Sequence, residues 1–588
     1  MTSGRTRRPA RPARRSGSPH HGRRHAGRTT PGDGERWGMD AAELLLLALG
    51  AVGVAAVSRR MGWQTPLVLV LVGFVVSLVP GVPELEIDGE LLLATVLPPL
   101  LYSSALGVSY VGFRALFHPI VQLGVGLVFV TAIVVALVAR VVVPGLPMSV
   151  ALVLGAIVAP PDAVSAASIG RKLGLPRPVM TVLSGESLIN DAAALTFYKV
   201  ALAGVFGASG SLLGIDWSSA AGTFTLAVLA GVATGLALGW LVHTLRMRLD
   251  DPVVESVLGL IVPFAAYLLA EELHGSGVLA VVAAGLYLGY RGPEAGYATR
   301  LQERPLWSSL DLLLEAVVFA LIGLQLRYVL GEVQASDRSD ATLLAAAVAV
   351  LAVVVLVRFG YVFGLELIRR APRPTRSGLS RPERPPWTYQ VVISWTGMRG
   401  VVTLAAAAAL PVEVDGAPFE DRGAVQFLAF AVTIGTLLVQ GLTLPRLIQR
   451  LGVQDRDQPQ RDAEEELHLQ ERSTEVALAR LDELVASLTP KIGADKAKEW
   501  DDRIRRPLLA RTETMHQAIR ADEEEQAERG RRRAQTFRRV RQQVIEVQRQ
   551  VLMEERDKGH VDEEVVRAVL QELDHEEAAG ASSWVSRF

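Results

Sequence analysis

Three acids and two bases lie within otherwise apolar stretches of this chain. They are Asp162, Glu186, Asp191, Arg358 and Arg399. An ionisable group near the centre of a bilayer costs on the order of 2.5–3.5 kcal/mol on insertion scales, so such groups are expected to be paired or functional. Acids in neighbouring stretches and bases in later ones predict a buried charge network.

Asp162 directly follows two prolines, Pro160 and Pro161. Each proline removes a backbone donor, so an unbroken helix is not expected there, and a break at membrane depth is tolerated only inside protein or beside water. A second weak point lies at 397–400, where two glycines flank Arg399. The alternative for Asp162 is a simple kink with the carboxylate in a packing pair.

These two weak points fall in the fifth and twelfth apolar stretches, seven apart, which gives them opposite orientations. Inverted repeats of six spans around a single connecting span have this arrangement, and paired broken helices indicate a transporter's midplane site. Helix N-termini favour an acid and C-termini a base. Asp162 and Arg399 would supply one of each.

The sixth stretch carries several oxygen groups on one side of a helix. Glu186 and Asn190 are four residues apart, and so are Ser187 and Asp191. Carboxylate, hydroxyl and carbonyl oxygens suit hard cations such as Na⁺. The alternative is a hydrogen-bond cluster that only holds helices together. Arg358 is either a snorkelling residue or the partner of Glu186, because a buried Arg is more tolerable beside a carboxylate.

These residues belong to a series of about thirteen apolar stretches, each near the ~20 residues that cross a bilayer. Arg and Lys are concentrated in the loops on one side, which predicts an N-terminus outside and a cytoplasmic C-terminus. The fold class is therefore an all-α polytopic membrane protein with inverted repeats and two broken crossing helices. The expected spans are 41–57, 65–80, 91–110, 119–143, 149–169, 178–206, 222–245, 253–271, 276–290, 308–326, 341–367, 388–411 and 424–445.

Three domains follow from the distribution of charge. Residues 1–38 are an Arg-rich extension that is predicted to be disordered, and Met39 is an alternative natural start. Residues 39–450 form the transmembrane domain, and residues 451–588 form a helical cytoplasmic tail. Valines at 540, 544, 547 and 551 recur as on an amphipathic helix. The tail either only packs on itself or serves as a dimerisation or regulatory module.

The sequence gives little support for an enzymatic function. The chain of 588 residues has no Cys, which excludes disulfides and thiolate metal sites. The sequence contains no P-loop, no HExxH cluster and no GxGxxG after a strand. No cofactor and no nucleic-acid partner are expected.

Several motifs in order resemble the monovalent cation:proton antiporter-1 family, in its bacterial sodium/proton branch. They are the stretches at 160–164, 185–191, 319–326 and 397–402. The resemblance covers roughly 41–450 and leaves the tail unassigned. It implies a homodimer of thirteen-helix protomers in a bacterial plasma membrane, with a role in pH homeostasis.

The resemblance also implies roles for individual residues. Asp191 is the principal carboxylate for Na⁺ and H⁺, with Ser187 near the ion, while Glu186 and Arg358 form a structural pair. Asn190 marks the branch similar to electroneutral exchangers. Many relatives carry Thr where this chain has Pro161, which offers no hydroxyl, so the choice among Na⁺, Li⁺ and K⁺ stays open.

The expected function is a sodium/proton antiporter in which proton and cation compete for Asp191. Burial raises the pKa of a carboxylate and a neighbouring cation lowers it, so one carboxylate can exchange one ion for the other. A potassium/proton antiporter is the nearest alternative. A cation channel, which needs a continuous pore, and a membrane-anchored sensor with an inert membrane part are the more distant ones.

Overall fold

The computed structural model describes the chain from residue 41 to residue 577, with gaps. Almost all of these residues are helical, as predicted. The described residues contain one β-sheet, a two-residue antiparallel pair of β1 (Glu413–Val414) with β2 (Ala417–Pro418). The extension 1–38 lies outside the described residues, which are 41–80, 82, 89–206, 217–249, 251–335, 338–370, 386–414, 417–455, 457–519 and separate stretches between 536 and 577.

Eight helical segments are long and apolar enough to cross a membrane, and three apolar helices are shorter, among the residues that the structure describes. Each predicted span overlaps helical structure. Length and composition alone do not establish thirteen spans, so that number stays a prediction. The first group of helices is α1 (Ala41–Met61), α2 (Thr65–Ser77), α3 (Gly89–Thr95), α4 (Leu97–Leu106), α5 (Tyr110–Ala115), α6 (Phe117–Val121), η1 (Gln122–Leu127) and α7 (Val128–Val142).

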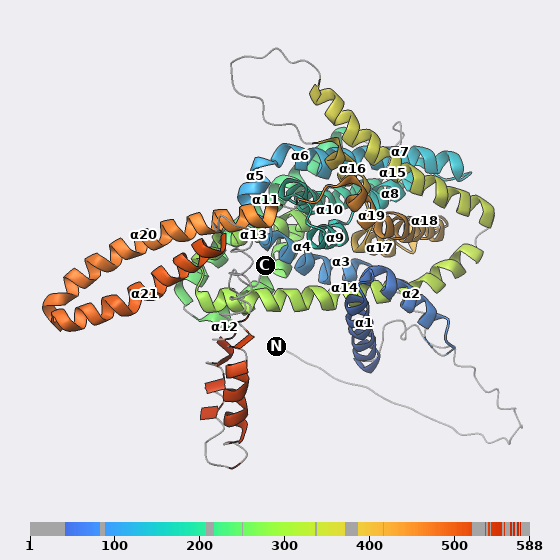
Figure 1. Cartoon of the computed structure of the whole chain (residues 1–588). Helices are drawn as coiled ribbons and strands as arrows, with labels where there is room; N and C mark the ends of the chain where they lie inside the picture. Colours follow the sequence, from blue (N-terminus) through green and yellow to red (C-terminus); the bar gives the residue numbers. More distant parts are fainter. Residues whose placement is uncertain are drawn as a thin grey trace, which may run out of the picture.

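The long helix α14 (Tyr297–Ala335) crosses the lower part of the bundle in Figure 1 and contacts α1, α2 and α4. The prediction placed only 308–326 in this element, but the helix has 39 residues. It packs closely on α2, because a Cβ added to Gly73 would lie 2.5 Å from the carbonyl oxygen of Ala320. Helix α12 (Pro252–Glu272) also contacts α14, while α11 (Trp217–Leu249) and α13 (Gly277–Arg291) pack on each other and on α12, and the short η2 (Gly292–Glu294) follows α13.

In α8 (Met148–Val158), every residue from Val150 to Val158 is buried. Such burial all round makes α8 an axis of the apolar core. Helix α7 packs along it, and α10 lies against the same core. The remaining helices of the bundle, of which α17 and α18 also contact α8, are α9 (Ala163–Lys172), α10 (Arg177–Phe206), α15 (Asp340–Arg370), α16 (Trp387–Trp395), α17 (Val401–Ala408), α18 (Arg422–Thr436), η3 (Leu437–Gly441) and α19 (Leu442–Leu451).

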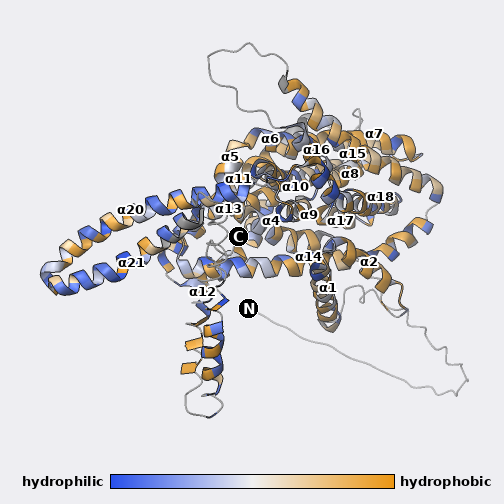
Figure 2. Cartoon of the chain, viewed as in Figure 1, coloured by the Kyte–Doolittle hydropathy of each residue, from blue (hydrophilic) through white to orange (hydrophobic). Residues whose placement is uncertain are grey.

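The tail begins as a helical hairpin of α20 (Gln458–Ile492) and α21 (Ala494–Ile519), which turns at Gly493 with φ +85°. It projects from the bundle in Figure 1, and Figure 2 shows its many hydrophilic residues beside the apolar bundle. The hydroxyls of Thr474 and Thr512 lie 3.2 Å apart between the two helices. The amide of Asp455 donates to the carbonyl oxygen of Gly174 at 3.0 Å, so the start of the tail contacts the α9–α10 turn.

Candidate functional site

Two interrupted helices meet in the middle of the bundle. The first interruption separates α8 from α9 at 159–162, and the second separates α16 from α17 at 396–400. Pro160 and Pro161 have no amide hydrogen to donate, which explains the first break. The amide of Asp162 instead donates across to the carbonyl oxygen of Met398, at 2.6 Å. The two breaks are therefore joined directly, backbone to backbone.

Each break supplies a charged side chain to a helix end of the other. The Arg399 guanidinium donates to the carbonyl oxygens of Val158, at 2.7 Å, and Ala159, at 3.1 Å, where α8 ends. The carboxylate of Asp162 lies beside Gly400, the N-cap of α17, because a Cβ added to Gly400 would meet it. A base thus lies at a helix C-terminus and an acid at an N-terminus, the favourable sense for both helix dipoles.

Helix α10 presents its oxygen groups to this crossing. The amide nitrogen of Asn190 donates to the carbonyl oxygen of Pro161 at 2.7 Å, which fixes the side chain against the break. Asp191 is only 7% exposed and interacts electrostatically with Asp162. Ser187 is half-buried one helical turn before Asp191. Asn190 and Asp191 therefore lie next to the break that carries Asp162, and Ser187, the fourth predicted ion-binding residue, precedes them by about one turn of the same helix.

Glu186 and Arg358 form a bidentate ion pair between α10 and α15. One guanidinium nitrogen lies 2.8 Å from a carboxylate oxygen, and the second nitrogen bonds the other oxygen. Both side chains are at most 2% exposed, so Arg358 does not snorkel to the surface. The Nε of Arg358 also donates to the carbonyl oxygen of Ile393 at 2.9 Å. Gly397 makes room for it, since a Cβ there would lie 2.8 Å from the Arg358 Cδ.

Two further residues lie at or near the site, although the sequence analysis did not place them there. The hydroxyl of Thr436, in α18, accepts the backbone amide of Arg399 at 3.0 Å and holds the second break from the far side. Glu315, in α14, interacts electrostatically with Asp162. A single Thr in an apolar helix is common, so Thr436 does not stand out in the sequence. Glu315 has no oppositely charged residue near it in its apolar stretch, so the sequence does not indicate which residues it faces.

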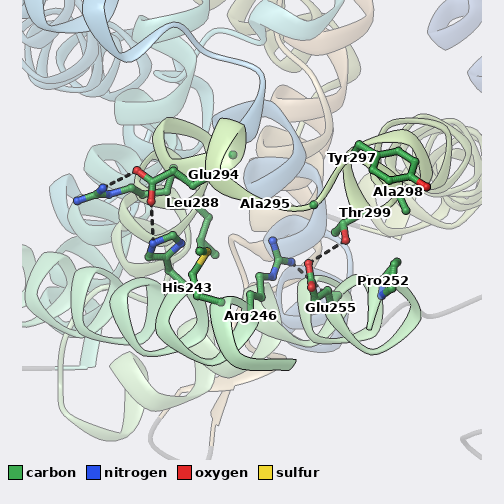
Figure 3. Close-up of a pocket in the computed structure, with 14 residues that line it drawn as sticks. His243, Arg246, Pro252, Glu255, Leu288, Glu294, Ala295, Tyr297, Ala298 and Thr299 are labelled. Carbon is green, nitrogen blue, oxygen red and sulfur yellow. Dashed lines mark hydrogen bonds and ion pairs between the residues drawn. The ribbon is translucent and has the colours of Figure 1, made fainter. Parts of the chain in front are cut away.

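A cavity of about 260 Å³ lies elsewhere, where α11 and α13 end and α12 and α14 begin. Figure 3 shows its polar lining, in which Thr299 donates to Glu255 at 2.8 Å and His243 lies 3.2 Å from Glu294. Arg246, at its edge, pairs with Glu303 at 2.7 Å. None of the predicted ion-binding residues lines this cavity. The described residues also contain no group of three or more His, Cys, Asp or Glu that could hold a metal ion.

Comparison with known proteins identifies similar proteins that are named as sodium/hydrogen exchangers. The family profile described as "Sodium/hydrogen exchanger, transmembrane" matches residues 44–450. The Na(+)/H(+) exchanger Rv2287 of Mycobacterium tuberculosis (strain H37Rv) is 33% identical over 564 residues, covering 94% of this chain and 98% of that protein. This match is longer than the transmembrane region, so it extends into the tail.

Two further proteins, one compared by sequence and one by structure, are also similar to this chain. The Na(+)/H(+) antiporter ApNhaP of Aphanothece halophytica is 31% identical and covers 75% of this chain and 80% of its own length. The solved structure of the sodium proton antiporter MjNhaP1 from Methanocaldococcus jannaschii at pH 8 matches with a TM-score of 0.55 at 20% identity, over 70% of this chain and 98% of that one. At this identity, the likeness shows the shared fold.

Proposed function

Because this chain belongs to the sodium/hydrogen exchanger family, we propose that it exchanges one sodium ion for one proton, with Asp191 as the carboxylate that holds either. The family consists of transporters that span the membrane. Exchange at one carboxylate needs no cofactor and no nucleotide. The energy source is then the concentration gradients of the two ions.

The observation that carries the proposal is the balance of charge at the crossing. Arg399 is compensated by the carbonyl oxygens at the end of α8, and Asp162 lies at the N-terminus of α17. Glu186 is compensated by Arg358. Asp191 forms no ion pair with any other described residue although it is buried. A buried carboxylate without a fixed counter-charge is expected to hold a mobile one.

The neighbouring oxygens support a cation there. The side-chain oxygen of Asn190 is buried and accepts no hydrogen bond from the described residues, while its nitrogen is fixed on Pro161. This orientation leaves the carbonyl-type oxygen of Asn190, the residue before Asp191, without a hydrogen-bond partner among the described residues. With Ser187 and Asp162, these groups form the hard oxygen set that alkali cations prefer. The missing hydroxyl at Pro161 removes one further ligand.

Proton and cation compete at Asp191 because a carboxylate that binds a cation is a weaker base. If only the loaded site moves between the two sides, this competition becomes exchange. Replacement of one Na⁺ by one H⁺ leaves the charge of the site unchanged, so we propose electroneutral exchange. We also propose a homodimer in a bacterial plasma membrane, with the N-terminus outside, the tail in the cytoplasm and a role in pH homeostasis.

The proposal is tested in proteoliposomes that contain an internal pH dye. Addition of Na⁺ outside is expected to change the internal pH, and responses to Li⁺ and K⁺ measure selectivity. Asp191→Asn should abolish the response while the protein stays folded, as judged by size-exclusion chromatography. Asp191→Glu, which keeps a carboxylate, should retain part of it.

Normal exchange by a folded Asp191→Asn protein would refute the role of this residue. A response to K⁺ alone would keep the mechanism and change the substrate. Cation flux that does not depend on the opposing ion would indicate a channel instead.

A further inference from the structure

The tail contains a second helical region, beyond the α20–α21 hairpin, that has two different apolar faces. Residues 543–554 are helical, and one face carries Ile545, which is 2% exposed. Arg549 on the same side donates to Asp574 at 2.5 Å and lies 2.7 Å from Glu577. Val566 and Leu573 are buried as well. This face is therefore covered by the last described stretch of the chain.

The other face is a row of valines, which we call the valine seam: Val540, Val544, Val547 and Val551. Each is between 52% and 58% exposed, so the described parts of the chain leave the seam open to water. The steps along the seam are four, three and four residues. This is the alternating spacing of the a and d positions of a heptad, whose 3.5-residue period matches a partner helix in a coiled coil.

We propose that the valine seam pairs with the seam of a second copy of this chain, so that two tails join in a short coiled coil. Its flanks favour an identical partner, because Gln543, Gln548 and Gln550 are uncharged and cannot repel the same residues of a second copy. Valine occupies both the a positions (544 and 551) and the d positions (540 and 547), so every layer of the seam is β-branched. This pairing is independent of the transport mechanism and of any dimer contact within the membrane.

A lipid surface is a poorer partner for the seam. Helices that lie on anionic membranes carry Lys or Arg along the polar face beside their apolar row. Beside Val544, Val547 and Val551 the flanks are glutamines, and the helix also carries Glu546 and Glu554. Arg549 is paired with Asp574 and Glu577, and the arginines at 538, 539 and 541 lie only at the start of the seam. A seam of four layers buries less than the area of a stable free-standing interface. Tethering of two copies in one membrane raises their effective concentration and offsets this shortfall.

The absence of Cys from the chain makes the test direct. Full-length proteins with Val544→Cys or Val547→Cys are expressed in membranes, singly and together, and treated with a mild oxidant. Parallel seams should link each variant to its own copies, and antiparallel seams should link the two variants to each other. Glu546→Cys is the matched control, because this exposed residue is one position away from the seam.

The expected result is a disulfide-linked dimer from the seam positions, several-fold more abundant than from Glu546→Cys. Adding the exposed substitution Val540→Arg should reduce the linked fraction while Na⁺/H⁺ exchange persists. Equal linking from 546 and 547 would overturn the proposal, because it indicates random collision. No linking at the seam would also overturn it, and protection of the introduced thiol from a water-soluble maleimide would then show that the bilayer covers the seam.

Discussion

The helix crossing and the tail hairpin use the same Arg–carboxylate chemistry in opposite surroundings. Arg358 and Glu186 are at most 2% exposed and form two hydrogen bonds. Arg480 and Glu483, on α20, form a comparable pair with both side chains 66% exposed. Water screens the second pair and not the first, so loss of one partner leaves a bare charge in the interior only at the crossing.

The two regions also differ in which elements their polar side chains connect. At the crossing, each of the two arginines is tied to more than one element: Arg399 to α8 and α18, Arg358 to α10 and α16. In the tail, the pairs mostly join neighbouring turns of one helix, as Arg480 and Glu483 do. Substitutions in the two regions should therefore differ in size as well as in their effect on transport.

The largest effect is expected from Arg358→Leu, which leaves Glu186 buried without its partner. Breaking a buried ion pair from one side costs about 3–5 kcal/mol. The thermal unfolding temperature of the purified protein should fall strongly. The double variant Glu186→Gln with Arg358→Leu should recover part of the loss, because no bare charge remains. If the single and double variants unfold at the same temperature, the pair does not contribute in this way.

Gly400→Ala tests the close contact of the two breaks. The added Cβ would lie 2.6 Å from the Asp162 Cβ, so the breaks must separate. Overpacking of this kind costs about 1–3 kcal/mol, and we expect a lower rate of Na⁺-driven proton movement. Gly364→Ala, in α15, is the matched control because nothing lies within 4 Å of its added Cβ. Equal activity of the two variants would show that the contact can relax without affecting transport.

The sequence predicts the crossing well because the rules that govern it are local. The Pro160–Pro161 pair breaks a helix in any context, and ionisable groups at membrane depth are rare enough to indicate a site. Prediction of the Glu186–Arg358 pair required one further argument, namely that a buried charge needs an opposite charge beside it. Thr436 and Glu315 were not assigned roles, because the hydrogen bond of Thr436 with Arg399 and the electrostatic influence of Asp162 on Glu315 arise only from tertiary packing.

The extent of the elements was harder to predict. Hydropathy gives the part of a helix that suits lipid, so the prediction of 308–326 missed about half of α14, whose charged first turns continue the helix beyond the apolar part. Hydropathy alone also misses the breaks within 149–169 and 388–411, which the Pro160–Pro161 pair and the two glycines beside Arg399 predict. There the apolar stretch is continuous, but the helix is not.

A smaller effect is expected where the tail contacts the transmembrane domain. Arg177, the first residue of α10, lies 2.7 Å from Asp462 and 3.3 Å from Glu465, and the arginine is 58% exposed. Exposed pairs contribute ~0.2–1 kcal/mol, so Arg177→Ala should barely change the unfolding temperature. A double-mutant cycle with Asp462→Ala measures the coupling, which should shrink further in high salt. A coupling energy as large as that of the buried Glu186–Arg358 pair would contradict the expected difference between buried and exposed ion pairs.

The smallest effect concerns pH and the hairpin alone. The Arg505 guanidinium hydrogen-bonds Asp501 and holds the pKa of that carboxyl below its ordinary range. A lowered folded-state pKa stabilises the hairpin above the unfolded value of about 4, and this contribution is lost as the pH falls through the lower folded value. Hydrogen exchange of α20 and α21 in the full-length protein should therefore accelerate slightly below pH 4. Arg505→Gln should remove that part of the pH dependence, and an unchanged profile would show that the pair contributes nothing, as exposed pairs often do.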